Sequence, residues 1–276
     1  MSATIDSDTA WDAFARRDRA FDGRFVVAVR STHIYCKPSC AARRPRREHV
    51  AFLPDAAAAQ AAGYRACRRC LPDSVARDRA AVIAAAALLA ADAPPPLAAL
   101  AAGVDYAPHH FHRLFHRLTG VTPAAYARTC RADRVLAALR ASDGVTAAIY
   151  AAGYGAPSRF YADAARLGMT PQAAAAGGAG ETLHWVRLAA PPGPLLLAAS
   201  ARGWSRFAFD EDVDEDGAAL RAAFPAATLL RGDAAFRARA TARVGRAAAV
   251  PADAALPLAI RNIAFRTLLH AQGNPD

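Results

Sequence analysis

The spacing of the cysteines places the strongest constraint on how this chain can fold. Cys36 and Cys40 are separated by three residues, Cys67 and Cys70 by two, and 26 residues lie between the two pairs. Paired thiolates that a fold brings together give the tetrahedral set of sulfur ligands that zinc favours. The sequence therefore predicts one Zn²⁺ bound by these four cysteines.

Buried cysteines without a ligand are the alternative interpretation, but two such close pairs seldom arise by accident. A disulfide framework would need an oxidising compartment. Residues 1–6 contain an early acid and lack the basic-then-apolar order of a secretory signal, so we expect a cytoplasmic protein. The longest apolar stretch, residues 80–91, is well short of the ~20 residues that a membrane-spanning helix needs, so no membrane partner is expected.

Positive charge concentrates around the cysteines. The formal net charge is +10, of which residues 1–80 contribute +6 from 15 basic and 9 acidic side chains. Lys37 is the only lysine, so nearly all of this charge is arginine, whose planar guanidinium suits phosphate oxygens. A solvated basic face is one interpretation, and a surface that follows a phosphate backbone is the other. The arginines close to the cysteines are Arg43, Arg44, Arg46, Arg47, Arg65, Arg68 and Arg69.

The cysteine spacing alone leaves the role of the zinc open. Most all-cysteine zinc sites are closed and purely structural. A zinc-bound thiolate is nevertheless deprotonated at neutral pH and remains nucleophilic. Placed against a DNA backbone, such a thiolate could attack an electrophilic carbon, so a reactive centre is the second interpretation.

Residues 25–40, FVVAVRSTHIYCKPSC, and residues 62–73, AGYRACRRCLPD, resemble the Ada family of DNA-methylation damage responders. The resemblance implies a zinc domain that accepts a methyl group from a methylphosphotriester in the DNA backbone. By position, Cys36 is the acceptor, and Lys37 stands where the family more usually has arginine. The residues matching positions that approach DNA near the acceptor are Thr32, Arg43 and Arg69.

Elementary chemistry supports such a transfer. A methylated phosphate is neutral, so it does not repel an anionic thiolate cluster, and in-line attack on the methyl carbon releases the stable phosphodiester anion. Methylation makes one thiolate a neutral thioether and so removes one unit of negative charge that faces phosphates. We expect stronger DNA binding afterwards, in an irreversible switch that each chain makes once.

Residues 97–172 contain a weak internal repeat with an offset of 48 to 50 residues. Each copy reads as a short helix, a turn with glycine, and a second helix opened by proline and closed by glycine, which is typical of a helix-turn-helix. Residues 123–140 begin with proline and contain no breaker, so they predict one connecting helix. The repeat resembles the AraC-type DNA-binding domain. Its matching landmarks are Gly103 and Gly153, Pro108 and Pro157, Phe111 and Phe160, Gly120 and Gly168, and Thr122-Pro123 and Thr170-Pro171.

The second helix of each copy carries candidate DNA contacts. Phe111, Leu114, Phe115 and Leu118 have the spacing of a buried helix face. The opposite face offers His109, His112, Arg113, His116 and Arg117 to a major groove, with metal binding by the histidines as the alternative. The second copy offers fewer groups, Ser158 and Arg159 beside Phe160, so we expect it mainly to position the first. Cys130 in the connecting helix is expected to be a small core residue.

Residues 173–180 are rich in alanine and glycine and predict a linker to a third domain. Residues 183–188, 195–199 and 204–209 read as short strands, and the acidic run 210–216 is expected to cap a helix containing Leu220 and Phe224. This region looks like the leading lobe of O6-alkylguanine transferases. In that family a Pro-Cys-His-Arg active site lies in a later helical lobe, and no cysteine follows Cys130 here, so no O6-methylguanine activity is expected.

The sequence thus predicts a multidomain α+β protein. Residues 1–78 form a small zinc-bound α/β domain, residues 79–176 an all-α double helix-turn-helix domain, and residues 181–276 an α/β, ribonuclease H-like lobe lacking the active-site subdomain. The predicted activity is single-turnover methyl transfer from DNA to Cys36, followed by transcriptional activation of an alkylation response on the bacterial nucleoid. The expected partners are double-stranded DNA, at methylated backbone and promoter sites, and RNA polymerase.

Two other functions remain open at this point. The first is an AraC-type transcription regulator whose zinc domain is structural or senses another electrophile, with no repair activity. The second is a general zinc-binding interaction module. It predicts DNA affinity with little salt dependence, which the arginine distribution disfavours.

Overall fold

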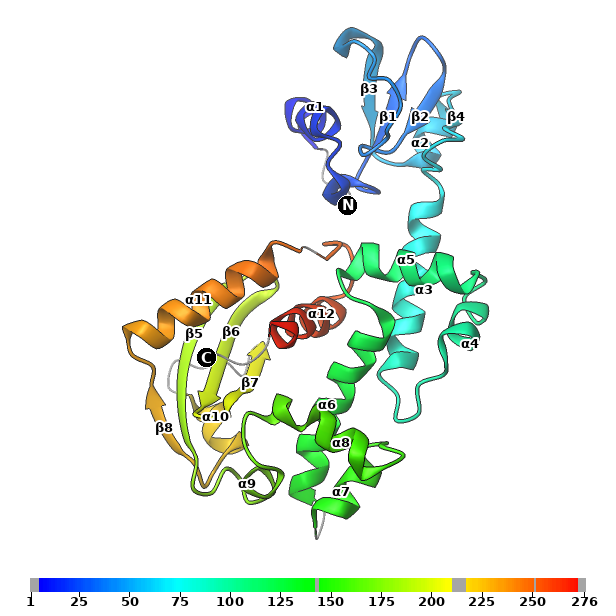
Figure 1. The fold of residues 1–276 in the computed structure, drawn as a ribbon. Coiled ribbons are helices and arrows are strands. Elements are labelled where there is room, and N and C mark those ends of the chain that lie inside the picture. Colours follow the sequence, from blue (N-terminus) through cyan, green and yellow to red (C-terminus); the bar gives the residue numbers. More distant parts are fainter. Residues whose placement is uncertain (1–4, 142–143, 210–216, 251, 273–276) are drawn as a thin grey trace. The chain divides into compact units, whose positions relative to one another are not determined.

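The structure is a computed structural model that describes residues 5–141, 144–209, 217–250 and 252–272. The chain forms two compact units, Met1–Ala81 and Val82–Asp276, and each is described by itself (Figure 1). No helix in these described ranges is long and apolar enough to cross a membrane.

The first unit is built on a four-stranded sheet with the order β3-β1-β2-β4. β1 (Val26–Val29) is antiparallel to both β2 (Ile34–Cys36) and β3 (Val50–Leu53). The short β4 (Arg65–Ala66) runs parallel to β2, with Tyr35 opposite Ala66. This register brings the end of β2 next to the residue that follows β4, so Cys36 and Cys67 become neighbours.

Helices cover both faces of this sheet because side chains alternate along β1. Val27 packs with Phe14 of α1 (Ser7–Arg16), while Val26 and Ala28 pack with Ala59 of α2 (Ala56–Ala61). Aspartates begin both helices: the carboxylate of Asp6 accepts the Thr9 N–H at 3.0 Å, and that of Asp55 accepts the Ala58 N–H at 2.8 Å. The two 3₁₀ helices of the unit are η1 (Arg19–Phe21) and η2 (Arg47–His49).

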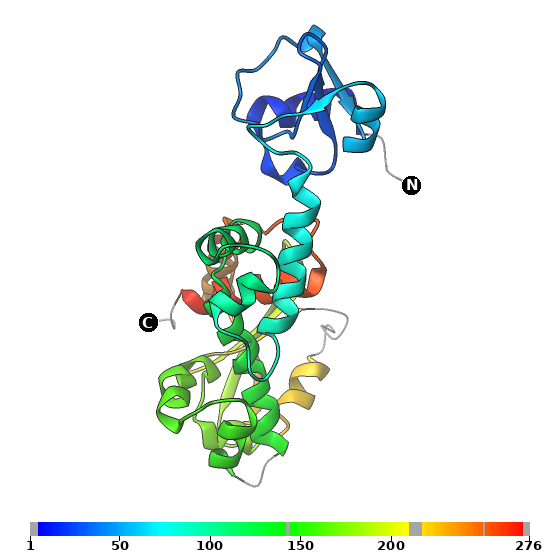
Figure 2. The same ribbon diagram turned by 90° about the vertical axis from the view of Figure 1, so that its right-hand side faces the viewer.

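α3 (Ser74–Leu89) begins in the first unit, and its later residues contribute to a core of the second; it can be followed in cyan in Figures 1 and 2.

The first half of the second unit confirms the predicted repeat: α4 and α5 form one helix-turn-helix, α7 and α8 form the other, and α6 connects them. Proline opens α5 and α8, and Gly120 ends α5 with a positive φ of 79°. The elements are α4 (Leu97–Ala102), α5 (Pro108–Thr119), α6 (Pro123–Ala141), α7 (Val145–Ala151), α8 (Pro157–Asp163), η3 (Ala164–Leu167) and α9 (Pro171–Ala175).

The second half of this unit contains the three predicted strands, each slightly longer than expected. β5 (Thr182–Ala190), β6 (Gly193–Ser200) and β7 (Gly203–Phe209) form an antiparallel meander, and β8 (Thr228–Arg231) runs parallel to β5, giving the order β7-β6-β5-β8. The acidic run 210–216 lies outside the described residues. α10 (Ala218–Ala223) contains Leu220 and ends just before Phe224. Beyond it lie α11 (Ala234–Ala248) and α12 (Leu258–Ala271), which the sequence analysis did not predict, as it did not predict β8.

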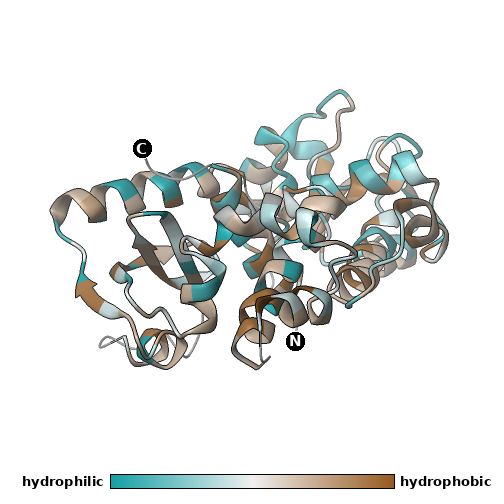
Figure 3. Ribbon diagram, turned by 60° about the horizontal axis from the view of Figure 1, so that its bottom comes forward, coloured by the Kyte–Doolittle hydropathy of each residue, from teal (hydrophilic) through white to brown (hydrophobic). Residues whose placement is uncertain are grey.

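Alternation along β5 gives this sheet two buried faces. Val186 packs with Phe236 of α11 and Phe265 of α12, whereas Leu183 and Trp185 pack with the helices of the second helix-turn-helix. Several helices carry both hydrophilic and hydrophobic residues (Figure 3), and α5 separates them into an exposed and a buried face. The predicted linker is compact, since α9 occupies its first part and the Gly178 N–H bonds the Ala173 carbonyl at 2.7 Å.

Candidate functional site

The fold brings Cys36, Cys40, Cys67 and Cys70 together, and their four Sγ atoms all lie within 4.8 Å of one another. A tetrahedral zinc with bonds of about 2.3 Å has its sulfur ligands about 3.8 Å apart, so the cluster fits that ion. Among the described residues no histidine or carboxylate shares the site. A donor set of four sulfurs suits zinc far better than magnesium or calcium.

Local backbone turns aim each cysteine at the centre of the cluster. The Cys67 N–H donates to the Tyr35 carbonyl at 2.9 Å, which extends the β2–β4 pairing by one residue. The first pair closes through a turn in which the Cys40 N–H donates to the Lys37 carbonyl at 3.0 Å. The second closes through a bond from the Leu71 N–H to the Cys67 carbonyl at 2.9 Å, with Leu71 in the left-handed region at a φ of 48°.

The loop between Cys36 and Cys40 is held by a residue that the sequence analysis missed. Asp22 accepts the Ser39 N–H at 3.0 Å and the Ser39 hydroxyl at 2.6 Å, and its carboxylate lies 4.0 Å from the Lys37 ammonium. The Asp22 carbonyl accepts a hydrogen bond from Arg79 of α3 at 2.5 Å. Asp22 thus fixes the cysteine loop and neutralises the charge of Lys37 beside it.

The sequence also gave no sign of the hydrogen bonds made by Tyr35, the residue before Cys36. Its side chain is fully buried. Its hydroxyl donates to Asp73 at 2.7 Å and accepts from Gln60 at 2.8 Å. Burial raises the pKa of this hydroxyl above its ordinary value. The network joins β2, α2 and the segment that follows Cys70.

The four thiols perturb one another because they are crowded and mostly buried. A hydrogen bond to Cys70, followed by burial, raises the pKa of Cys36 far above that of a free thiol, and burial raises the pKa of Cys40. The hydrogen bond from Cys36 lowers the pKa of Cys70 to about 6, with help from the backbone N–H of Lys37. The thiols therefore resist ionising together, and a divalent cation is what makes four thiolates compatible at neutral pH.

The arginines predicted to face DNA divide into two groups. Arg44 donates to the Ala15 carbonyl, Arg47 pairs with Asp8 of α1 and stacks on Trp11, and Arg46 lies 3.7 Å from Glu48. The remaining ones are exposed, as is Thr32 in the turn before β2, and they make no ion pair within the described ranges. This second group, which we call the open arginines, comprises Arg43, Arg65, Arg68 and Arg69.

The candidate recognition helices expose the predicted faces. On α5 the residues Phe111, Leu114 and Phe115 are buried and Leu118 is half-buried, which confirms the predicted packing. The opposite face is exposed at His109, Arg113, His116 and Arg117, with His112 half-buried, and these histidines form no metal-binding group in the part of the chain described. On α8, Ser158 and Arg159 are exposed and Phe160 packs against Tyr154, with ring centroids 5.6 Å apart.

Cys130 is a core residue, as predicted. It is 6% exposed and lies among Phe115, Tyr126 and Leu100 in the core behind α5. Burial raises the pKa of its thiol to about 11, and the nearby Asp133 adds to the shift. Such a thiol is protonated and unreactive at neutral pH.

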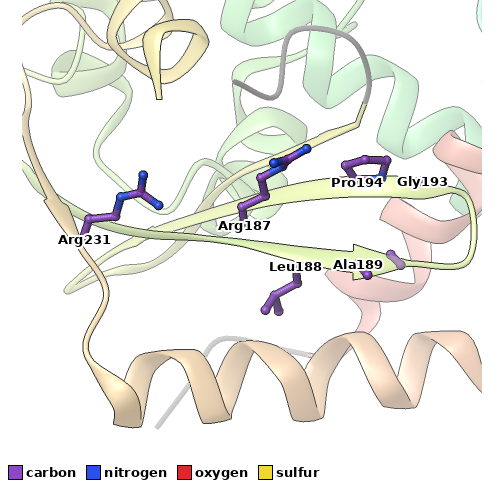
Figure 4. A pocket seen from close by; sticks show the side chains of 7 residues that line it. Arg187, Leu188, Ala189, Gly193, Pro194 and Arg231 are labelled. Carbon is purple, nitrogen blue, oxygen red and sulfur yellow. The ribbon is translucent and has the colours of Figure 1, made fainter. Parts of the chain in front are cut away.

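A separate pocket opens on the sheet of the second unit (Figure 4). Arg187 and Arg231 extend on one side of the sheet there, whereas Leu188 points to the other side, toward a helix. Arg231 lies over the ring of Trp185, 4.0 Å from its centroid. None of the predicted site residues lines this pocket, which is formed by residues 187–190, 193, 194 and 231.

Comparison with known proteins matches two parts of the chain to described families. Residues 9–73 match the metal binding domain of Ada, and residues 100–176 match a helix-turn-helix domain. The "Regulatory protein ada" of Salmonella typhimurium is 36% identical over 96% of this chain and 76% of its own length. The chain belongs to the Ada family.

A second Ada relative, the "Bifunctional transcriptional activator/DNA repair enzyme Ada" of Escherichia coli, is 35% identical over 95% of this chain and 75% of that protein. The solved DNA methyl phosphotriester repair domain of E. coli Ada is 46% identical, with 26% of this chain and 79% of that chain covered and a TM-score of 0.24. The Ada metal-binding match contains all four clustered cysteines, and Zn²⁺ is the cofactor of this site.

Proposed function

We propose that this Ada-family protein transfers a methyl group from a DNA backbone methylphosphotriester to Cys36 and then activates transcription of an alkylation response. The observation that carries the proposal is the four-sulfur cluster bordered by the open arginines. It combines a nucleophile with a surface suited to phosphate. The names of the two long relatives, a regulatory protein and a transcriptional activator and DNA repair enzyme, support the same combination.

The transfer is a single displacement. The Cys36 sulfur forms a bond to the methyl carbon, the bond from that carbon to the phosphate oxygen breaks, and the electron pair leaves on the oxygen of the restored phosphodiester. Zinc, when bound, keeps the cysteines deprotonated at neutral pH. Cys40, Cys67 and Cys70 hold the nucleophile in place, and Asp22 fixes the loop that carries it. A thioether is a stable linkage, so we expect each chain to react once.

Methylation then alters DNA affinity. One negative charge is lost from a cluster that faces phosphates, so binding becomes stronger. The open arginines and Thr32 follow the backbone, while Arg44, Arg46 and Arg47 mainly hold α1 and η2. The exposed face of α5 enters a major groove of the promoter, with Ser158 and Arg159 of α8 in a supporting position. A cytoplasmic location on the nucleoid and contact with RNA polymerase belong to the same proposal.

The choice of acceptor rests on the position of Cys36 in the Ada motif. Cys70 is the competing candidate because it is the most exposed member of the cluster. The decisive experiment locates the methyl group. Zinc-loaded protein is incubated with a duplex that carries one methylphosphotriester, digested and examined by mass spectrometry, and we expect one methyl group per chain, on Cys36.

Two variants sharpen this experiment. Cys36→Ser should lose methyl acceptance while retaining zinc, and Cys130→Ser should behave as the wild type. A methyl group on Cys70 would overturn the acceptor. No methyl transfer at all would leave the second candidate, an AraC-type regulator whose zinc domain is structural or senses another electrophile. A duplex with O6-methylguanine should transfer nothing to these residues, and a label on Cys130 would contradict that expectation.

A further inference from the structure

Residues 181–276, which we call the C-terminal lobe, pack directly behind both helix-turn-helices. Phe160 and Met169 of the second helix-turn-helix share a core with Trp185 and Leu196 of the sheet. Phe111 and Phe115 on the inner face of α5 share another core with Leu256, Ile260 and Ala264, the last two on α12 (Figure 1). Both candidate recognition helices are thus buried against one rigid body on the side opposite their exposed faces.

The lobe comes close to the second helix-turn-helix at its closing glycine. Gly168 has a positive φ of 60°, and a Cβ atom there would lie 2.5 Å from the Trp204 carbonyl carbon and 2.6 Å from the Gly203 oxygen. The Gly168 carbonyl accepts hydrogen bonds from the hydroxyls of Ser200 and Ser205, the latter at 3.3 Å. Only glycine fits at this point, because the lobe's backbone occupies the space of a side chain.

The first helix-turn-helix meets the lobe at the equivalent place. A Cβ atom on its closing residue, Gly120, would lie 2.9 Å from Val250 Cγ1. One residue before the end of α5, the Leu118 carbonyl accepts the Asp253 N–H at 2.7 Å, which supplies one of the acceptor contacts that a helix C-terminus needs. The two matching glycines of the sequence repeat are therefore both contact points with the lobe.

The connecting helix α6 is held by the same body. The Thr267 hydroxyl of α12 donates to the Thr129 hydroxyl at 2.9 Å in a buried position, and Arg266 pairs with Asp133. The lobe itself carries little net charge, +1 from 11 basic and 10 acidic side chains, so a phosphate-binding role is not what its composition favours.

We propose that the C-terminal lobe is a DNA-recognition scaffold: it fixes the separation and orientation of the two recognition helices so that both engage one duplex. This rests on the proposed promoter reading by the helix-turn-helix region. A pair of recognition helices reads adjacent major grooves only if they are held about one helical turn, roughly 34 Å, apart along the DNA. The connecting helix α6 shares a core with each helix-turn-helix, through Tyr126 in one and Leu139 in the other. The lobe adds a second connection between them, because it contacts both closing glycines as well as α6.

The test uses the full chain and a matched pair of glycine variants. Gly168→Ala and Gly180→Ala both place an alanine at a positive φ, 60° and 78°, but a Cβ atom at Gly180 meets nothing within 4 Å. The backbone strain is thus comparable, and only the first variant disturbs the lobe contact. A Ser200→Ala, Ser205→Ala double variant removes the two hydroxyl donors without adding volume, so it tests the same contact if Gly168→Ala does not fold.

The probe is a duplex enriched by the wild-type chain from a random-sequence pool, together with a copy in which about half a helical turn is inserted between its two protected segments. Wild type and Gly180→Ala should bind the inserted copy at least about tenfold more weakly. Gly168→Ala and the serine variant should lose this discrimination and protect the first segment only. Equal discrimination in all four proteins would overturn the scaffold.

Failure of the underlying function gives a different result. If the wild-type chain enriches no duplex, promoter reading itself is wrong, and the scaffold falls with it. If it enriches a duplex with a single protected segment, promoter reading stands and the scaffold is overturned. Methyl acceptance by Cys36 should be the same in every variant, which separates these outcomes from damage to the zinc site.

Discussion

Asp22 receives two hydrogen bonds from Ser39, one from its backbone N–H at 3.0 Å and one from its hydroxyl at 2.6 Å. Ser39 lies between the two cysteines of the first pair, so the carboxylate fixes the backbone that presents Cys36 and Cys40. Hydrogen bonds to a charged, partly buried acceptor are stronger than neutral ones. The zinc centre therefore depends on a residue that provides no ligand atom.

Replacing Asp22 by asparagine should weaken zinc binding by about tenfold, the effect of losing an outer contact that orients ligands. Asparagine keeps the size of the side chain but offers one oxygen instead of two and no charge to balance Lys37. The measurement is competition for zinc against a chromogenic chelator. Asp12→Asn, the same change at an exposed position of α1, is the control, and equal zinc affinities for the two variants would refute the role of Asp22.

Tyr35→Phe should lower the free energy of unfolding of the zinc-loaded first unit by about 1 kcal/mol. The substitution keeps the buried ring but removes the hydroxyl that joins Asp73 and Gln60. Denaturant unfolding measures the loss, and Tyr161→Phe, at a hydroxyl on a 59% exposed side chain, should change nothing. Unchanged stability of Tyr35→Phe would mean that water replaces the hydroxyl without cost.

Removal of zinc should unfold the first unit and leave the second folded. In its described part, residues 5–81, the first unit has two small apolar cores besides the cysteine cluster, and without the metal its buried thiols must take up protons. The measurement is chelator titration followed by NMR of resolved methyl signals, such as those of Val27 and Leu197 in the two units. We expect loss of the Val27 signal together with release of one zinc per chain, while the Leu197 signal persists.

The opposite pattern would be informative. If the Val27 signal keeps its native position after zinc has left, the cluster contributes reactivity but little stability. Cys130→Ser serves as the control in this titration, since that thiol lies outside the cluster and should leave the zinc stoichiometry unchanged.

Local patterns predicted the double helix-turn-helix, three strands of the second sheet and the zinc ligands, but not β8, α11, α12 or the contacts that fix the zinc site. The short cysteine spacings and the glycine and proline landmarks are repeated in sequence, so they are visible without a structure. Asp22 and Ser39 are 17 residues apart, and Tyr35 and Asp73 are 38 apart, with no periodic signal that links either pair. Such contacts depend on tertiary packing. The same packing explains why Arg44 and Arg47 contact α1 and are not among the open arginines.

The same limit explains the second unit. Residues 173–180 have the composition of a flexible linker. The helix-turn-helices before them and the lobe after them nevertheless share two hydrophobic cores, because each part buries its apolar surface against the other. The composition of a segment indicates which conformations it can adopt, but not which other segments pack against it.

The buried thiol of Cys130 should make the second unit less stable at alkaline pH. Its pKa is raised to about 11 in the folded protein, whereas an unfolded thiol titrates near 9. Above pH 9 the unfolded chain loses a proton that the folded chain keeps, so ionisation favours unfolding. The stabilisation is fully present below pH 9 and is lost as the pH rises toward 11. By pH 10 the loss should be about 1 kcal/mol.

Comparison of the wild type with Cys130→Ala isolates this effect. Other groups titrate equally in both proteins. Between pH 8 and pH 10 the free energy of unfolding of the wild type, measured in denaturant, should therefore fall by about 1 kcal/mol more than that of the variant. Alkylation gives an independent reading: at pH 8 about one thiol in a thousand is ionised, so iodoacetamide should label Cys130 slowly until the protein unfolds. Parallel stability curves, together with rapid labelling of the folded protein, would show that Cys130 is accessible to solvent and that the core behind α5 is open.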